Sequence, residues 1–221
     1  MQLFSFFSSS TAFRIRIALA LKGADYEYQA VNLRAGEQHQ QAFLDRNPSG
    51  SVPALVDGDF NLGQSLAILD YLDSRYPEPR LIPADTIQRA RVLELVNVIA
   101  CDIHPVNNLR VQLYLKNILG VTEAQKNIWY RHWVAQGFDV VERLLARQED
   151  TPYCFGTHPT LADCCLAPQV WSAARAGCDI AAYPRIDRIY RHCMAQPAFI
   201  QAAPEQQADA PQGGLSGCTN R

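Results

Sequence analysis

The sequence lacks the features that would place this chain in a membrane or on a nucleic acid. No apolar run reaches the roughly 18 residues that suggest a membrane-spanning helix. No basic stretch followed by an apolar one opens the chain, so we expect no signal peptide and a cytoplasmic location. The 20 Lys and Arg against 22 Asp and Glu leave a net charge of −2, which offers nucleic acid no basic field. These absences favour chemistry on a small molecule.

The seven cysteines lack the spacing of a disulfide framework or a zinc site. Their number is odd and no C-x-x-C pair is present. We therefore expect reduced, mostly buried thiols and no bound metal. None lies in the hydroxyl-rich turn described below, so a thiol acting at that turn is expected to belong to a ligand.

The first third of the chain alternates strand patterns with helical ones. A strand–helix–strand order followed by a hairpin and a second helix predicts a small α/β domain with a mixed sheet over residues 1–79. The predicted elements are strand 2–7, helix 14–22, strand 26–32, a hairpin over 52–62 and helix 64–76.

The rest of the chain has a different pattern. Prolines mark residues 80–85 as a linker. Apolar residues at three- and four-residue steps predict an all-helical domain over residues 86–205. Its expected helices are 86–101, 106–119, 123–146, 160–176 and 183–195. Residues 206–221 are rich in Gln, Ala, Gly and Pro, which is typical of a flexible tail.

Hydroxyl groups gather where the first strand turns into the first helix, at Ser8, Ser9, Ser10 and Thr11. The free N–H groups and the dipole of a helix N-terminus favour a negative atom. A hydroxyl at such a turn can also bind a thiolate and lower its pKa below the roughly 8.5 of a free thiol. The alternative is that these residues only cap the helix.

Two further motifs in the first domain suit a peptide-like ligand. A proline entering a hairpin strand at Val52-Pro53 indicates a strand edge or a cis bond. Val52 would then offer its backbone N–H and C=O to an extended ligand, unless the segment is only a rigid turn. Gln64 and Ser65 begin another helix, where an anion such as a carboxylate would bind and where Ser65 is also a candidate cap.

The helical domain carries fewer polar candidates. His104 and Asn108, four residues apart, are expected to share a helix face, with Pro105 starting or bending the helix between them. Arg175 stands among small residues, and its planar fork suits a carboxylate. A structural histidine and a surface arginine are the alternatives. Thr160 and Asp163 have the spacing of a capping box, which we interpret as structural.

Together these motifs resemble the zeta class of the glutathione transferase superfamily, and in particular its bacterial maleylacetoacetate and maleylpyruvate isomerases. The resemblance runs from residue 2 to about residue 203. Its motifs are residues 8–19, Val52-Pro53, residues 64–68, residues 101–110 and residues 160–163. It implies a thioredoxin-like, glutathione-binding domain followed by an all-α, substrate-binding domain, and a homodimer.

The resemblance also implies roles for individual residues. Two positions depart from the family pattern: Thr11 stands where cysteine is common, which need not affect the isomerisation, and Ser8 stands where arginine is usual, which leaves the choice of substrate open. The implied roles are catalysis at Ser9, Ser10 and Thr11, glutathione binding by Gln38, Val52, Gln64, Ser65, His104, Asn107, Asn108 and Arg110, and substrate binding by Arg175.

The implied activity is a glutathione-dependent cis–trans isomerisation of a maleyl diketo acid, maleylacetoacetate to fumarylacetoacetate, by reversible addition of the glutathione thiolate. Such a reaction belongs to the catabolism of aromatic compounds, tyrosine among them. The alternatives are a maleylpyruvate isomerase, a zeta-like transferase or dehalogenase acting on α-halo acids, and a non-catalytic glutathione-binding scaffold.

Overall fold

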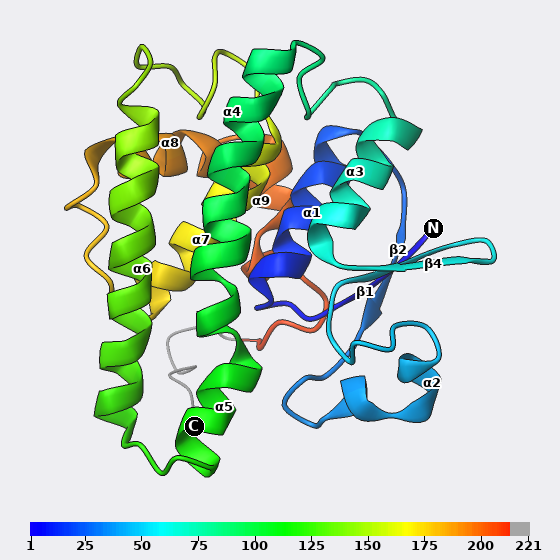
Figure 1. Cartoon of the computed structure of the whole chain (residues 1–221). Coiled ribbons are helices and arrows are strands. Elements are labelled where there is room, and N and C mark those ends of the chain that lie inside the picture. The colour runs from blue at the N-terminus through cyan, green and yellow to red at the C-terminus, as the bar shows by residue number, and fades with distance from the viewer. Residues whose placement is uncertain (213–221) are drawn as a thin grey trace. The chain divides into compact units, whose positions relative to one another are not determined.

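The chain forms two compact units in a computed structural model that describes residues 1–212 (Figure 1). The first unit contains Met1–Ile82 together with the C-terminal stretch from Ala195, and the second contains Pro83–Met194. This division differs from the expected domains of 1–79 and 86–205. Leu81 and Ile82 donate their backbone N–H groups to Asp73, at 2.7 and 3.1 Å, which ties half of the expected linker to the first unit.

The first unit is built on a four-stranded sheet in the order β2-β1-β3-β4. Strand β1 pairs parallel with β2 and antiparallel with β3, and β3 and β4 form the expected hairpin. This mixed sheet confirms the thioredoxin-like fold predicted for the first domain. The strands are β1 (Gln2–Ser5), β2 (Glu27–Ala30), β3 (Ala54–Asp57) and β4 (Phe60–Gly63).

Helix α1 (Ser10–Leu21) contacts α3 (Ser65–Arg75) and α9 (Pro197–Ala202), as Figure 1 shows. Apolar residues of α1 such as Phe13, Ile15 and Ile17 are fully buried, as its apolar pattern predicts. Helix α9 explains why residues 195–205 do not group with the helical unit. It packs on α1, and Arg16 donates through Nε to the Ala202 carbonyl at 2.9 Å. The short elements η1 (Glu37–His39) and α2 (Gln41–Leu44) lie between β2 and β3 in the chain.

A second apolar group of the first unit forms where the chain leaves β1. Strand 2–7 was predicted, but β1 ends at Ser5. The next two residues, Phe6 and Phe7, do not extend the sheet and belong to a buried apolar cluster instead. We call this group the Phe7 cluster. Its members are Phe6, Phe7, Val31, Phe43, Val52 and Ala54.

The second unit consists of helices, and its described residues include no strand. Helix α4 contacts α7, α6 contacts both η2 and α8, and α7 contacts α8. The predicted helix 86–101 continues as a π-helix, which ends just before Pro105. The elements are α4 (Thr86–Asn97), η2 (Val98–Ile103), η3 (Pro105–Asn107), α5 (Leu109–Asn117), α6 (Glu123–Leu145), α7 (Leu161–Arg175) and α8 (Pro184–Met194). In the described part of the chain, no helix is long and apolar enough to cross a membrane.

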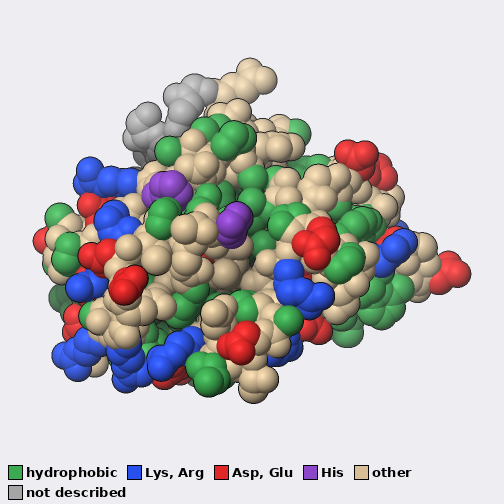
Figure 2. Space-filling model, turned by 90° about the horizontal axis from the view of Figure 1, so that it is seen from above, with side chains coloured by type: hydrophobic (Ala, Val, Ile, Leu, Met, Phe, Trp, Pro, Cys, Tyr) green, Lys and Arg blue, Asp and Glu red, His purple; other side chains and the backbone are tan. Residues whose placement is uncertain are grey.

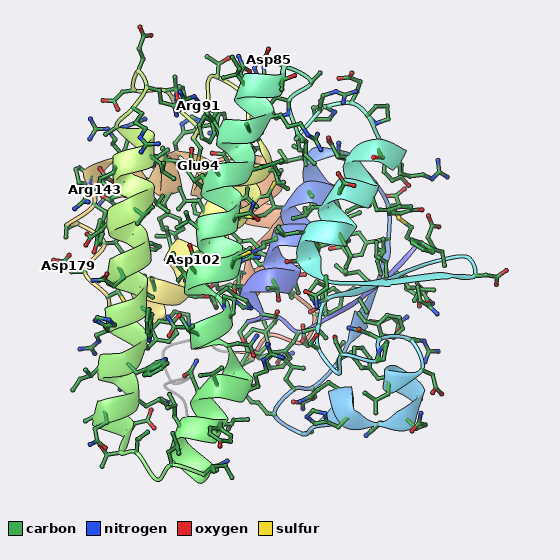
Figure 3. The ribbon with its side chains drawn as sticks, in the orientation of Figure 1. Asp85, Arg91, Glu94, Asp102, Arg143 and Asp179 are labelled. Atoms are coloured by element: carbon green, nitrogen blue, oxygen red, sulfur yellow. The ribbon has the colours of Figure 1, made fainter. Side chains whose placement is uncertain are left out.

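Side-chain caps fix where these helices begin. Asp85, labelled at the start of α4 in Figure 3, accepts from the N–H groups of the first turn. The predicted capping box at Thr160 and Asp163 is confirmed, and Asp163 also accepts from the Cys154 N–H at 2.8 Å. Burial raises the pKa of Asp163, although these hydrogen bonds oppose the shift.

The cysteines of residues 1–212 are all free, as expected, and most are buried. Cys101 is exposed and Cys178 is half-buried, whereas Cys218 lies outside the described residues.

The expectation of a flexible tail over residues 206–221 is wrong for its first part. Asp209 accepts hydrogen bonds from the Phe7 N–H and the Tyr28 hydroxyl, which attach this stretch to the first unit. Residues 213–221 lie outside the described part of the chain.

Candidate active site

Ser9 is the N-cap of α1. Its backbone is extended (φ −72°, ψ 115°), and its Oγ accepts from the Ala12 N–H at 3.2 Å. Capping, the structural alternative for this turn, therefore takes place. It does not exclude an anion site, because no acidic residue lies in the first turn to oppose the positive end of the helix dipole.

Thr11 links this turn to the segment before β3. Its Oγ1 lies 3.0 Å from Ser9 Oγ and donates to the Val52 carbonyl at 3.1 Å. Because a hydroxyl has only one proton, Ser9 must be the donor in the bond between the two hydroxyls. The Thr11 hydroxyl thus accepts a hydrogen bond from Ser9 and donates one to the Val52 carbonyl.

Val52 precedes a cis peptide bond to Pro53, one of the two outcomes its sequence indicated. Its carbonyl, which the sequence analysis left free for a ligand, already accepts from Thr11 and keeps one lone pair. Within residues 1–212, no protein group accepts from the Val52 N–H. The backbone of Val52 thus retains one donor and one acceptor site.

The N-terminus of α3 has an unusual backbone. Gln64 is the N-cap residue, and its φ of 64° is rare for any residue except glycine. Such backbone strain is often found at functional sites. The alternative that Ser65 caps α3 is wrong, because Ser65 is the first helical residue and its Oγ accepts from Arg14 Nη1 at 3.2 Å.

Arg14, which the sequence analysis did not single out, contacts the start of α3. It lies in the continuously buried stretch of α1, is 1% exposed and places a positive charge behind the N-terminus of α3. The signal was present in the sequence: a charged residue at a buried position of an apolar helix requires polar partners.

Gln38 lies in η1 and is buried. Its Nε2 lies 3.1 Å from His39 Nε2, whereas its Oε1 is buried and accepts no hydrogen bond from the described residues. A buried acceptor in this state is costly unless a water or a ligand supplies a donor.

In the second unit, His104 and Asn108 meet, but not on one helix face as expected, because Asn108 is the extended N-cap of α5. His104 Nε2 lies 3.2 Å from Asn108 Nδ2, and Asn108 Oδ1 caps α5 by accepting from the Arg110 N–H at 3.1 Å. The side chain of Arg110 is exposed in the first turn of α5. Asn107 points elsewhere: it is 7% exposed and donates to the Tyr130 carbonyl of α6 at 3.2 Å.

Arg175 is the last residue of α7, and its guanidinium lies over the Trp171 ring, 4.6 Å from the centroid. The sequence analysis did not predict that Tyr130 lies near Arg175, because the residues around Tyr130 in the sequence do not distinguish it from other helical tyrosines. Burial raises the pKa of the Tyr130 hydroxyl, and Arg175 opposes that shift. At neutral pH Tyr130 is therefore a hydrogen-bond donor next to a fixed cation.

The face of the molecule seen in Figure 2 shows no large field of one charge among its described residues. On the face seen in Figure 2, basic and acidic side chains are interspersed. Figure 3 also shows charged residues of both signs along α4 and η2, among them Arg91, Glu94 and Asp102.

A thioredoxin-like sheet, a hydroxyl turn beside a cis-proline and a following helical unit together define the architecture of a glutathione transferase. Models of the glutathione S-transferase N-terminal and C-terminal domains match residues 1–74 and 127–192. A probable maleylacetoacetate isomerase of Vibrio cholerae is 48% identical over 94% of this chain and 97% of its own length. The chain belongs to the glutathione S-transferase family, in its zeta class.

Two solved structures are similar to it throughout. A holo maleylpyruvate isomerase, described as a bacterial zeta-class glutathione S-transferase, has a TM-score of 0.94 at 46% identity and covers 96% of this chain and 100% of its own. A maleylacetoacetate isomerase of Methylobacterium extorquens with bound malonate and glutathione has a TM-score of 0.89 at 39% identity, with the same coverage.

Proposed function

We propose that this protein is a glutathione-dependent cis–trans isomerase that converts maleylacetoacetate to fumarylacetoacetate. The observation that carries the proposal is the 48% identity to a probable maleylacetoacetate isomerase over nearly the whole of both chains. We further propose that it acts as a cytoplasmic homodimer in the catabolism of aromatic compounds such as tyrosine.

The free groups of the first unit fit glutathione. The Val52 N–H and the second lone pair of its carbonyl suit the extended peptide backbone of that ligand. The buried Oε1 of Gln38 suits an N–H toward the glycyl end. The start of α3, at Gln64 and Ser65 with Arg14 behind it, suits the γ-glutamyl carboxylate.

Glutathione, when bound, supplies a thiolate that adds reversibly to the cis double bond, so that the bond rotates before the thiolate leaves. The chain's part is to hold that negative sulfur. Ser9 can turn its proton from Thr11 toward the sulfur, because Thr11 keeps its own bond to Val52. The N–H groups at the start of α1, at Ser10 and after, add the positive end of the helix dipole and lower the pKa of the thiol.

The residues of the second unit have the remaining roles. We propose that His104, Asn108 and Arg110 bind glutathione, and that Asn107 contributes by holding η3 on α6. Arg175 binds the substrate carboxylate, with its guanidinium held in place by the Trp171 ring.

Maleylpyruvate is the second candidate substrate. It is favoured by the structural similarity to a maleylpyruvate isomerase at a TM-score of 0.94. Ser8 does not separate the two substrates, because both are dicarboxylates and a hydroxyl there in place of the usual arginine removes a cation that either would contact.

The test is to add maleylacetoacetate and maleylpyruvate separately to the purified protein, with and without glutathione, while measuring loss of the cis isomer and free thiol. Glutathione-dependent isomerisation with the thiol concentration unchanged is expected. Turnover of an α-halo acid with release of halide, and of neither maleyl compound, would identify a dehalogenase instead. Tight glutathione binding with no turnover of any of these would identify a scaffold.

A further inference from the structure

The C-terminal stretch after α9 returns to the hydroxyl turn of the first unit. The chain passes through η4 (Pro204–Gln206) to Asp209. One carboxylate oxygen of Asp209 accepts from the Phe7 N–H at 3.0 Å, and the other accepts from the Tyr28 hydroxyl at 2.6 Å. Phe7 lies two residues before Ser9, so the carboxylate holds the peptide that leads into the turn.

The next peptide group, which joins Phe7 to Ser8, is held from α1. The Phe7 carbonyl accepts from Arg16 Nη2 at 3.0 Å, and Arg16 also donates to Ser5 Oγ and the Ala202 carbonyl. Strand β1 ends at Ser5, so sheet pairing no longer fixes the chain at this point. Instead, hydrogen bonds from Arg16 of α1 and to Asp209 of the C-terminal stretch hold the backbone there.

Packing joins the same stretch to the other wall of the proposed glutathione site. Ala210 packs against the Phe7 cluster, which includes Val52. Arg34 covers the cluster from outside, with its guanidinium 5.9 and 5.8 Å from the centroids of the Phe6 and Phe7 rings. Residues 209 and 210 therefore contact elements that carry both Ser9 and Val52.

The charges around Asp209 favour a persistent bond. Burial lowers the pKa of Arg16 to about 10, with Tyr28, Tyr26, Asp209 and Glu205 opposing the shift, so Arg16 keeps its charge at neutral pH. Burial and the bond to Asp209 raise the pKa of Tyr28, which therefore remains a donor.

We propose that Asp209 is a positioning residue that holds the Phe7 peptide and, through it, sets the orientation of the Ser9 hydroxyl. The role rests on the proposed function, since the thiol that Ser9 serves is that of glutathione. A carboxylate suits the task because it offers an acceptor to each of two donors. An asparagine has one oxygen and would turn its NH₂ group toward a donor, which loses one bond.

The test is Asp209→Asn in the full chain, with Asp59→Asn as the matched control. Asp59 is an exposed acid of the β3–β4 turn in the same unit. We expect Asp209→Asn to raise the pKa of bound glutathione by about half a unit, which lowers the thiolate fraction about threefold below that pKa. The ultraviolet absorbance of the thiolate against pH gives this pKa, and kcat/KM is expected to fall in parallel. The control leaves both quantities at the wild-type level.

Tyr28→Phe provides a second variant that keeps the carboxylate and removes one of its partners. We expect a smaller shift in the same direction, and no further shift when it is combined with Asp209→Asn, because both changes act through one carboxylate. An Asp209→Asn protein that unfolds earlier but keeps the wild-type thiol pKa and kcat/KM would reduce Asp209 to a structural anchor and overturn the role. If the wild-type protein itself fails to lower the pKa of glutathione, the proposed function fails first.

Discussion

The Ser9 hydroxyl has two duties that can be separated by substitution. As a cap it accepts from the Ala12 N–H, and in the proposed reaction it donates to a thiolate. Aspartate caps as well as serine, but it brings a negative charge and no proton to donate.

We therefore expect Ser9→Asp to unfold at the wild-type urea concentration while kcat/KM falls by about 100-fold or more. Ser9→Ala is expected to lose similar activity and, in addition, about 1 kcal/mol of stability through the missing cap. Urea unfolding and steady-state kinetics on the three proteins separate the two duties. A Ser9→Asp enzyme with wild-type kcat/KM would mean that Ser9 does nothing beyond capping.

How well single residues could be predicted depends on how local their partners are. The capping box of Thr160 and Asp163 lies within one helical turn and was correct from spacing alone. Gln38 was named only through the family resemblance; the structure buries its amide and leaves Oε1 without a donor among the described residues, which no local pattern indicated. Tyr130 and Asp209 carried no local signal either, since their partners come from other elements.

Among the elements, the π-helix η2 is the one that periodicity does not reveal. The regular helix expected after it is also interrupted, because η3 ends at Asn107 and Asn108 is the extended N-cap of α5. Asn107 faces α6, whereas Asn108 pairs with His104. A spacing rule based on a regular α-helix predicted the contact between His104 and Asn108 but not the separate direction of Asn107.

Close packing of η2 on α6 depends on Gly137. A Cβ at this position would lie 2.1 Å from Ile103 Cγ1, and Ile103 is fully buried. Gly137→Ala would stabilise an exposed helix, but here we expect it to lower the free energy of unfolding by about 1–3 kcal/mol.

The companion variant is Ile103→Ala, which removes the atoms that clash. In that background we expect Gly137→Ala to cost less than it does alone, which urea unfolding of the four proteins measures. If the losses of unfolding free energy in the two single variants simply added up in the double variant, the close contact between Gly137 and Ile103 would be contradicted.

For the whole molecule, the order of helices and strands was predictable from the sequence, but the way the chain divides into two compact units was not. The sheet of the first unit and the helices of the second follow from local apolar patterns. In the sequence, the stretch from Ala195 has the same apolar spacing as the helices before it. It nevertheless groups with the first unit, because its hydrogen-bond partners, such as Arg16 and Phe7, lie near the start of the chain.

Proton linkage gives a prediction for the molecule as a whole. If the protein binds glutathione as the thiolate, binding releases a proton between the lowered pKa of the bound thiol and the roughly 8.5 of the free thiol. The Kd should then fall as pH rises through that window, by up to about tenfold per pH unit, and level off above it. S-methylglutathione has no thiol proton, so its Kd should not follow this dependence.

Thermal unfolding at a fixed ligand concentration measures the same quantity, because a ligand that binds only the folded state at 100 times its Kd stabilises it by about 2.7 kcal/mol. Each tenfold fall in Kd adds about 1.4 kcal/mol to that figure. We expect the stabilisation by glutathione, relative to that by S-methylglutathione, to grow with pH up to about 8.5. Equal pH dependence for the two ligands would mean that the Ser9 turn and the start of α1 do not bind the thiolate in preference to the thiol, and the proposed mechanism would lose its central step.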